Sequence, residues 1–532
     1  MPLNPDESSL QSLTRRQVIV TLAGALLAMF LSSLNQTVVS TAMPRIVSDL
    51  GGFTQYTWVT TSFIIASTVT VPIVGKLTDI YGRKWLYVLG LLVFTLGSLL
   101  CGFSQNMAQI IGFRVVQGIG SGIIIASTFI VVADLFPPAE RGKYQGLMSA
   151  VFGISSIIGP TLGGLITDNF SWTWVFFMNV PLGVLVIGLF ISSFPDLRPD
   201  VSKHKIDYSG TVTLILFVVP TMLALSWAGV EYPWISAPIL GMFAFAAVMF
   251  CSFLFIESRA EEPIFSSKIF DNRIVVLSAI IIFLTGFGQF GAIIFIPLFF
   301  QGVLGASATA SGSFLTPMML GMVIGSILSG QVLSRVGGHY RRQGILGLAL
   351  MALGIGLLSQ MSASTSYSTA VFNIVVTGAG LGITMPLYLI AVQNAVPYSI
   401  MGMATSATVF FRQIGGAFGL AIFGSIMNNR FASELLHRLP PAAKEAISPE
   451  PLNSLSNNPH ALLSPEAKAQ LRGVLEQSES LGSDLFESVF QALQTALSSA
   501  ITQVFFIAFV LIVAAWTANL FIKEIPLRKQ HN

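Results

Sequence analysis

Ten residues between two long apolar runs set the architecture of this chain: Gly75-Lys76-Leu77-Thr78-Asp79-Ile80-Tyr81-Gly82-Arg83-Lys84. This short connection holds two glycines, one acid and three basic residues. A degenerate repeat of this pattern occurs 255 residues later, at Gly330-Gln331-Val332-Leu333-Ser334-Arg335-Val336-Gly337. A charged turn that occurs twice, half a chain apart, predicts a duplicated bundle whose halves move against each other.

The composition shows that lipid is the solvent of this chain. Of its 532 residues, 53% are hydrophobic and 10% are charged, whereas soluble domains carry about 25% charged residues. The net charge of +3 is too small to indicate a nucleic-acid partner. Cys101 and Cys251 both lie in apolar runs, so we expect packed thiols and no disulfide or metal site.

The apolar runs predict an all-α membrane protein with fourteen transmembrane helices, because about twenty apolar residues cross a bilayer as a helix. The first run is too long for a signal-peptide core, so we expect it to be retained. The predicted spans are 18–43, 56–75, 85–104, 107–132, 144–167, 172–194, 209–229, 236–256, 273–299, 311–333, 344–361, 369–391, 402–426 and 500–522.

The basic residues predict the orientation. Nineteen lysines and arginines fall on one set of loops and termini, and only Arg45 falls in the short loops on the opposite side. Short cytoplasmic loops carry this excess of positive charge, so we expect both termini in the cytoplasm, in a cell (inner or plasma) membrane. The connection from about 428 to 499 is long, polar and external. We expect short helices there, capped at Ser448 and Ser464, as part of either a plain linker or a cap over the exit.

A second repeat supports the duplication. Val115-Val116-Gln117-Gly118-Ile119-Gly120-Ser121-Gly122-Ile123 matches Val375-Val376-Thr377-Gly378-Ala379-Gly380-Leu381-Gly382-Ile383 at an offset of 260 residues. The sequence therefore predicts two pseudo-symmetric six-helix halves, residues 1–206 and 263–532, with two additional spans in residues 207–262. Parallel repeats of this kind are a transporter layout, with the substrate site between the halves near the bilayer midplane.

These residues resemble the major facilitator superfamily, and within it the fourteen-span drug:proton antiporters. The turn at 75–84 is similar to the signature loop of the superfamily. Arg114-Val115-Val116-Gln117-Gly118-Ile119-Gly120 is similar to its proton-coupling motif, and Gly159-Pro160-Thr161-Leu162-Gly163-Gly164 to the motif typical of exporters. Phe411-Arg412-Gln413-Ile414-Gly415-Gly416 is a further match to the subgroup. The resemblance implies a multidrug efflux transporter without a cofactor, driven by a proton gradient.

Two groups of residues are candidates for gating. In the charged turn, Asp79 can face basic groups or a helix N-terminus and hold one conformation as a latch. In the fifth span, small residues allow close helix packing and a proline bends the helix; ordinary packing explains them equally well. The gating candidates are Gly75, Asp79, Gly82, Arg83, Lys84, Gly159, Pro160, Gly163 and Gly164.

Coupling is assigned to Arg114, Gln117, Asn35 and Asp134. Arginine within a span is functional by default, and Arg114 and Asn35 lie at about the same depth, roughly 10 and 12 Å below the outer ends of their spans. The chain departs from the subgroup at Asn35, where the resemblance implies an aspartate. Asparagine cannot titrate, and none of the 24 acids falls near the middle of a predicted span. Coupling then rests on Asp134, on Asp79 or on another ion, or is absent.

Substrate contacts are expected from polar and aromatic side chains inside the spans. Arg412 lies near the midplane, so the cavity is expected to favour neutral or anionic amphiphiles over cations; capping of backbone carbonyls is the alternative role for Arg412. The candidate substrate-binding residues are Asn35, Gln36, Phe63, Gln289, Gln301, Phe411 and Arg412.

The leading prediction is a secondary active exporter of small amphiphiles that works by alternating access. Two alternatives remain open: an exporter or facilitator of lipids or anionic metabolites with non-standard coupling, and a non-transporting sensor on a transporter scaffold. No nucleotide-binding loop or cluster of catalytic side chains is present in the sequence, so an enzyme is not expected. Small amphiphiles and the lipid bilayer are the expected partners. The oligomeric state stays open, with a monomer as one expectation.

Overall fold

The computed structural model describes residues 14–51, 55–194, 206–306, 315–336, 338–441 and 482–528. In these residues fourteen helical segments are long and apolar enough to cross a membrane, which confirms the predicted all-α membrane class. The first half of the chain contains α2 (Arg15–Leu50), α3 (Tyr56–Tyr81), α4 (Arg83–Gly102), α5 (Met107–Leu135), α6 (Pro138–Asn169), and the short α7 (Trp174–Phe177) that leads into α8 (Asn179–Ser193). Two further helices follow, α9 (Tyr208–Trp227) and α10 (Ala237–Glu257).

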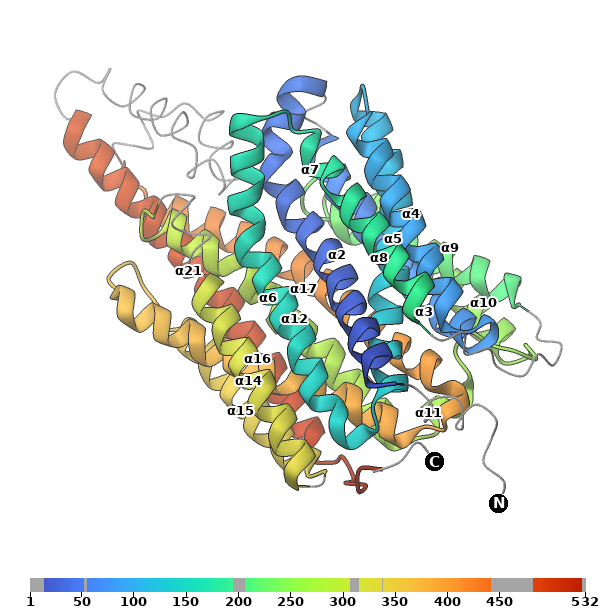
Figure 1. Cartoon of the computed structure of the whole chain (residues 1–532). Coiled ribbons are helices and arrows are strands. Elements are labelled where there is room, and N and C mark those ends of the chain that lie inside the picture. Colours follow the sequence, from blue (N-terminus) through green and yellow to red (C-terminus); the bar gives the residue numbers. More distant parts are fainter. Residues whose placement is uncertain are drawn as a thin grey trace.

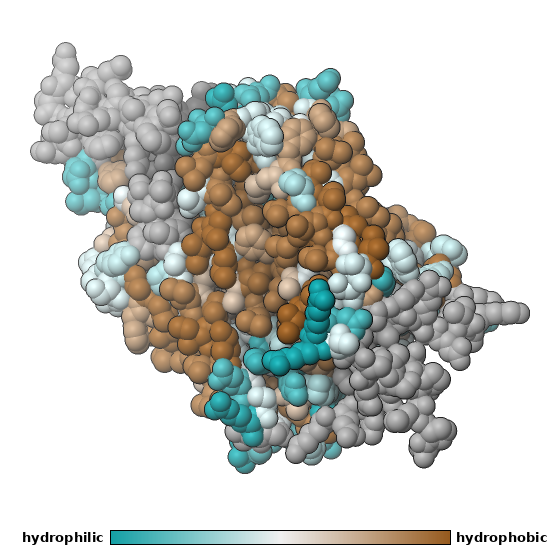
Figure 2. Space-filling model, viewed as in Figure 1, coloured by the Kyte–Doolittle hydropathy of each residue, from teal (hydrophilic) through white to brown (hydrophobic). Residues whose placement is uncertain are grey.

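The second half of the chain starts after the short helix α11 (Ser267–Phe270). It contains α12 (Arg273–Gly302), α14 (Leu315–Val336), α15 (Tyr340–Leu358), α16 (Tyr367–Ala395), the 3-10 turn η2 (Tyr398–Ile400), α17 (Met401–Arg438) and α21 (Gly482–Asn519). Figure 1 shows the two chain termini at the same end of the bundle, which we call the terminus end. The other end is the outer end. Hydrophobic residues form a broad band between hydrophilic residues at the two ends (Figure 2), as a bilayer-spanning bundle requires.

The two sets of six helices share most of their neighbours. In the first set, α5 packs on α3 and α4, α6 packs on α2, and α8 packs on α2 and α4. In the second set, α16 packs on α14 and α15, α17 packs on α12, and α21 packs on α12 and α15. Helices at equivalent places in chain order therefore make equivalent contacts, except that α17 also packs on α21 and α6 makes no comparable contact with α8. The boundaries of the three units at 206/207 and 262/263 stay predictions.

The repeated glycine motif has the same contacts in both sets. Gly118 faces the backbone of Phe63 in α3, and Gly120 faces Phe94 in α4. In the second set, Gly378 faces the backbone of Met318 in α14, and Gly380 faces Met351 in α15. Alternate glycines thus let one helix approach two neighbours at backbone distance, which explains why the pattern occurs in both halves.

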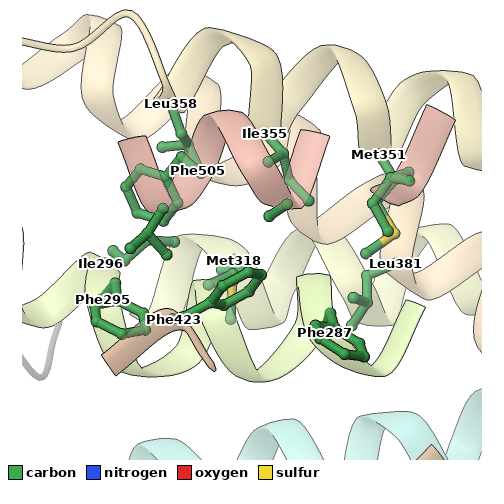
Figure 3. Packing of buried hydrophobic residues seen from close by; sticks show 14 of the residues in the cluster. Phe287, Phe295, Ile296, Met318, Met351, Ile355, Leu358, Leu381, Phe423 and Phe505 are labelled. Atoms are coloured by element: carbon green, nitrogen blue, oxygen red, sulfur yellow. The ribbon is translucent and has the colours of Figure 1, made fainter. Parts of the chain in front are cut away.

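One apolar core holds the second set together. Side chains from α12, α14, α15, α16, α17 and α21 meet in it, as Figure 3 shows for Phe295, Met318, Ile355, Phe423 and Phe505. The buried aromatic rings of α12 and α17 pack edge to face, with 5.8 Å between the ring centroids of Phe287 and Phe423. Dense packing of this kind makes the half a rigid unit that resists local deformation.

The two halves meet through α6 against α14 and through α3 against α17. A Cβ placed on Gly142 of α6 would lie 2.6 Å from the Cα of Gly330 in α14, and one placed on Gly75 of α3 would lie 2.8 Å from the carbonyl oxygen of Gly402 in α17. Both contacts lie near the terminus end, because α6 and α17 begin there and α3 and α14 finish there. The halves are therefore in backbone contact at this end.

The two additional helices, α9 and α10, pack on each other, and α9 contacts both α3 and α17. The segment after α10 folds back on the same seam. Glu257 accepts hydrogen bonds from the backbone N–H groups of Ile264 and Phe265, both at 3.1 Å, and Lys76 of α3 pairs with Glu262. This segment therefore ties the additional helices to α3 at the terminus end.

Some helices extend well beyond the apolar runs from which they were predicted. α17 continues past residue 428 to Arg438 and α21 begins at Gly482, so both extend into the predicted connection 428–499. The extension of α17 is supported by Glu434, which pairs with Arg430 at 2.7 Å and with Arg438 at 2.9 Å. Such i,i+4 pairs stabilise a helix outside the membrane. The predicted helices capped at Ser448 and Ser464 lie outside the described residues.

Candidate functional site

A buried polar triad joins α2 and α5. The Nη1 of Arg114 donates to Oδ1 of Asn35 at 2.6 Å and to Oε1 of Gln117 at 2.7 Å. Its Nε donates to the carbonyl of Val59 at 3.1 Å, and its guanidinium lies 4.0 Å from the ring centroid of Phe63. The structure thus brings together four residues that the sequence assigns to coupling or binding. The equal depths of Asn35 and Arg114 correctly predict that they meet.

The triad carries a positive charge without a carboxylate. Arg114, Asn35 and Gln117 are fully buried, and in the described residues Arg114 makes no ion pair closer than 4 Å. Its Nη2 and the amide nitrogens of Asn35 and Gln117 have no hydrogen-bond partner there. An aspartate at position 35 would supply the missing charge, so the substitution noted in the sequence leaves this cation supported by neutral acceptors and one aromatic face.

The fifth-span motif packs α6 against its own half. A Cβ on Gly163 would lie 2.9 Å from the carbonyl oxygen of Val38 and 3.0 Å from Cβ of Thr41, both in α2. Gly159 faces Thr37, which donates to the carbonyl of Ser155 at 3.1 Å. Gly164 has open space instead. The motif therefore fixes α6 to α2 at Val38, three residues after Asn35 of the triad. Its role in gating stays a prediction.

A second cluster joins the halves at the terminus end. Asp79 of α3 accepts hydrogen bonds from the first backbone N–H groups of α17, from Gly402 at 3.2 Å and from Met403 at 3.0 Å. A carboxylate at a helix N-terminus is stabilised by unpaired N–H groups and by the helix dipole. Gly82, at φ 84°, is the single residue between the end of α3 and the start of α4, and it reverses the direction of the chain. Asp79 thus faces a helix N-terminus, one of the two settings that the sequence predicts.

Arg83 extends this contact into α5. Its Nη2 lies 3.4 Å from Asp79, and its Nε donates to Asp134 at 3.0 Å. Asp134 also accepts from the hydroxyl of Tyr398 in η2 at 2.9 Å. Asp79, Arg83, Asp134 and Tyr398, together with the first turn of α17, are called the latch below. Lys84 lies outside the latch, because its ammonium donates to the carbonyl of Ile191 in α8.

The opposite seam, between α6 and the second half, has its own polar contacts. Arg141 is buried and donates to the carbonyls of Ala133 and Phe136 at 2.6 and 2.8 Å and to Gln393 of α16 at 3.3 Å. Ser149 accepts from Ser326 of α14 at 3.2 Å. The terminus end is therefore closed along both seams by groups that can exchange partners when the halves separate.

A pocket lies between the halves beside this closed end. In this conformation the pocket is narrow, with room for little more than a water molecule. Both halves line it, with residues from α2, α5, α6, α16 and α17. The lining residues are Met29, Phe129, Gln145, Met148, Ser149, Phe152, Met385, Pro386 and Arg412. Such pockets combine apolar walls with a few polar groups, so this is the candidate substrate site.

The structure separates the predicted substrate-binding residues. Arg412 lines the pocket, while Asn35 and Phe63 belong to the triad. Phe411 packs on Phe270 and Phe410 at centroid distances of 6.4 and 5.9 Å. Of the other three, Gln289 is buried, Gln36 and Gln301 are partly buried, and none is among the residues that line the pocket. These four residues therefore do not line the described pocket.

Sequence reasoning missed most of the pocket. Gln145 and Met148 follow the polar segment at 138–144, so they read as the start of a span close to the loop. The structure begins α6 at Pro138, which moves both residues two to three turns into the helix. Tyr398 was missed because it lies in a connection between two spans and is 264 residues from its partner Asp134 in the sequence. The available signal in the sequence for the early start of α6 was Pro138, because proline is common at the first position of a helix.

Comparisons with known proteins agree with this architecture. The family model of the Major Facilitator Superfamily matches residues 25–420. The multidrug transporter protein MdtP of Bacillus subtilis is 38% identical over 524 residues, covering 97% of this chain and 94% of that protein. Multidrug resistance protein 3 of the same species is 37% identical, with 94% of each chain covered. A crystal structure of the human organic anion transporter MFSD10 covers 96% of this chain with a TM-score of 0.56 and 13% identity, a likeness of fold alone.

Proposed function

The chain belongs to the Major Facilitator Superfamily, and we propose that it is a secondary active exporter of small amphiphilic molecules that works by alternating access. One observation carries the proposal. A pocket lined by both halves lies next to a closed end, where Asp79, Asp134, Arg141 and Ser149 bond across the seams. Opening these bonds while the outer end closes would expose the same pocket to the opposite side of the membrane.

The terminus end is proposed to be cytoplasmic. The basic residues of the short loops cluster there, as the positive-inside rule requires. The structure then corresponds to the conformation that is closed toward the cytoplasm. We place the protein in the cell membrane on the same grounds.

Proton coupling is proposed to run through the latch. The triad has no group that gains or loses a proton near neutral pH, whereas Asp134 binds both Arg83 and Tyr398 in the closed conformation. Protonation of this carboxyl would remove its charge-assisted bond to Arg83 and weaken the closure. Inward movement of protons could thus be exchanged for outward movement of cargo.

The experiment is flux of a fluorescent amphiphile in proteoliposomes with and without a pH gradient. We expect wild-type flux to rise with the gradient, and Asp134→Asn to transport without a response to it. Asp134→Glu is expected to restore the response in part, and Asp168→Asn, at an exposed acid near the outer end of α6, is the matched control. Absence of flux for a panel of anionic, neutral and cationic amphiphiles would refute the proposed function and favour a sensor.

A further inference from the structure

We propose that the pocket recognises anionic amphiphiles, with Arg412 and Gln145 binding the anionic head group. The proposal rests on the proposed function and names its substrate class. Arg412 of α17 lines the pocket and donates from Nη2 to the carbonyl of Met385 at 3.2 Å. In the described residues it makes no ion pair closer than 4 Å, so a planar guanidinium with five donors has donors to spare.

Gln145 supplies a second, independent polar group. It lies in α6, on the other side of the seam, and lines the same pocket. It is 2% exposed, and in the part of the chain that the structure describes neither its Oε1 nor its Nε2 has a hydrogen-bond partner. Buried amides are nearly always bonded, so an unbonded one beside a pocket indicates a ligand or water contact there. Its Nε2 can donate to an anion that Arg412 binds.

The charge of the surroundings favours an anion. None of the nine residues that line the pocket is acidic. Arg141, also buried, lies one turn from Gln145 along α6. The nearest acid along α5 is Asp134, which is occupied by Arg83 and Tyr398. A cationic head group would meet Arg412 without a neutralising carboxylate, whereas a carboxylate, sulfate or sulfonate matches the two-pronged geometry of a guanidinium.

The rest of the pocket suits a flexible apolar body. Met29, Met148 and Met385 come from three helices, and Phe129 and Phe152 complete the walls. Methionine side chains are unbranched and adapt to different shapes, which suits surfaces that bind varied ligands. The site therefore combines one fixed charge requirement with loose shape requirements.

Export of an anionic cargo is also compatible with a triad that contains no acid. A membrane potential that is negative inside drives a monovalent anion outward, by about fiftyfold in concentration for each 100 mV. Export of an anion can therefore draw on the potential directly. A buried carboxylate at position 35 is not required to make outward transport favourable.

The test compares two permanently charged probes of equal chain length, radiolabelled decyl sulfate and decyltrimethylammonium, each below its micelle concentration. Binding is measured to the full chain in nanodiscs of uncharged lipid. We expect the anion to bind at least tenfold more tightly than the cation. Arg412→Gln should weaken anion binding by about ten- to a hundredfold, the range for a hydrogen-bonded charge, and leave cation binding unchanged or stronger.

Three further variants sharpen the result. Arg412→Lys should keep part of the preference because the charge remains, and Gln145→Leu should weaken the anion alone. Arg45→Gln is the matched control, because this arginine at the outer end of α2 is 63% exposed and pairs with Asp49; it should change nothing. Equal or tighter cation binding, no effect of Arg412→Gln, or no binding of either probe would overturn the proposal. Flux of a neutral amphiphile, measured in parallel, separates these outcomes from failure of the proposed function.

Discussion

Replacing Asp79 by asparagine should open the terminus end. Asp79 accepts two backbone hydrogen bonds from the start of α17, at 3.2 and 3.0 Å, and lies 3.4 Å from Arg83. Hydrogen bonds to a charged group contribute about 1.5–3 kcal/mol each, and a charge at a helix N-terminus contributes about 0.3–1 kcal/mol more. Asparagine keeps one acceptor oxygen, so we expect the closed conformation to lose about 2–4 kcal/mol relative to the open one.

This loss changes the ratio of closed to open molecules by about thirty- to several-hundredfold, since 1.4 kcal/mol corresponds to a factor of ten. The ratio can be measured with spin labels on Lys143→Cys and Gln331→Cys. These exposed positions flank the contact between Gly142 and Gly330. Cys251 is exposed, which differs from the packed thiol expected from the sequence, and it is first replaced by serine; the buried Cys101 is kept.

In the wild type we expect one short distance between the labels, measured by double electron–electron resonance. In Asp79→Asn a second, longer distance should become prominent. Asp49→Asn removes an acid that is 42% exposed at the outer end of α2 and should leave the distribution unchanged. An unchanged distribution in Asp79→Asn, in a variant that still binds cargo, would refute the role of Asp79 as a closing contact.

Two other substitutions test the remaining parts of the site. Asn35→Asp places a carboxylate beside the already buried Arg114. We expect the free energy of unfolding at neutral pH to rise by about 1 kcal/mol, the difference between charged and neutral hydrogen bonds, and this gain should vanish at acid pH, when the new carboxyl is protonated. A lower melting temperature at neutral pH would contradict the account of the triad. Gly163→Leu should cost about 1–3 kcal/mol by overpacking α6 on α2, whereas Gly164→Leu, which enters open space, should cost little; equal melting temperatures for the two variants would show that this close helix contact is unimportant.

The fold was accessible from the sequence because the solvent imposes it. Apolar runs of about twenty residues must be helical in lipid, so the number and order of the spans could be predicted from the positions of these runs along the chain. The ends of the helices could not. α2 starts at Arg15 and α17 reaches Arg438, because helices continue in water where capping and i,i+4 pairs support them, and hydropathy does not detect this.

The site could be predicted from the sequence only where a charged residue lies in or next to an apolar run. Arg114 and Asp79 are charged groups in or next to apolar runs, so a polar partner had to lie nearby. Gln145 is an ordinary amide directly after a polar segment, and its importance follows only from the helices that meet beside it. The tail after α21 is a further example: Tyr340 accepts from the N–H of Ile525 and donates to the carbonyl of Lys523, both at 2.7 Å, a contact that depends on tertiary structure.

The central claim is that the two halves rock about the pocket, so that one end closes as the other opens. Its most direct test adds a second pair of spin labels at the outer end, on Asn169→Cys of α6 and Leu315→Cys of α14, in a separate sample. When Asp79→Asn or a change of pH lengthens the distance between positions 143 and 331, the distance between positions 169 and 315 should shorten. If both distances lengthen together, or the outer distance stays constant while the terminus end opens and transport continues, the rocking account is contradicted.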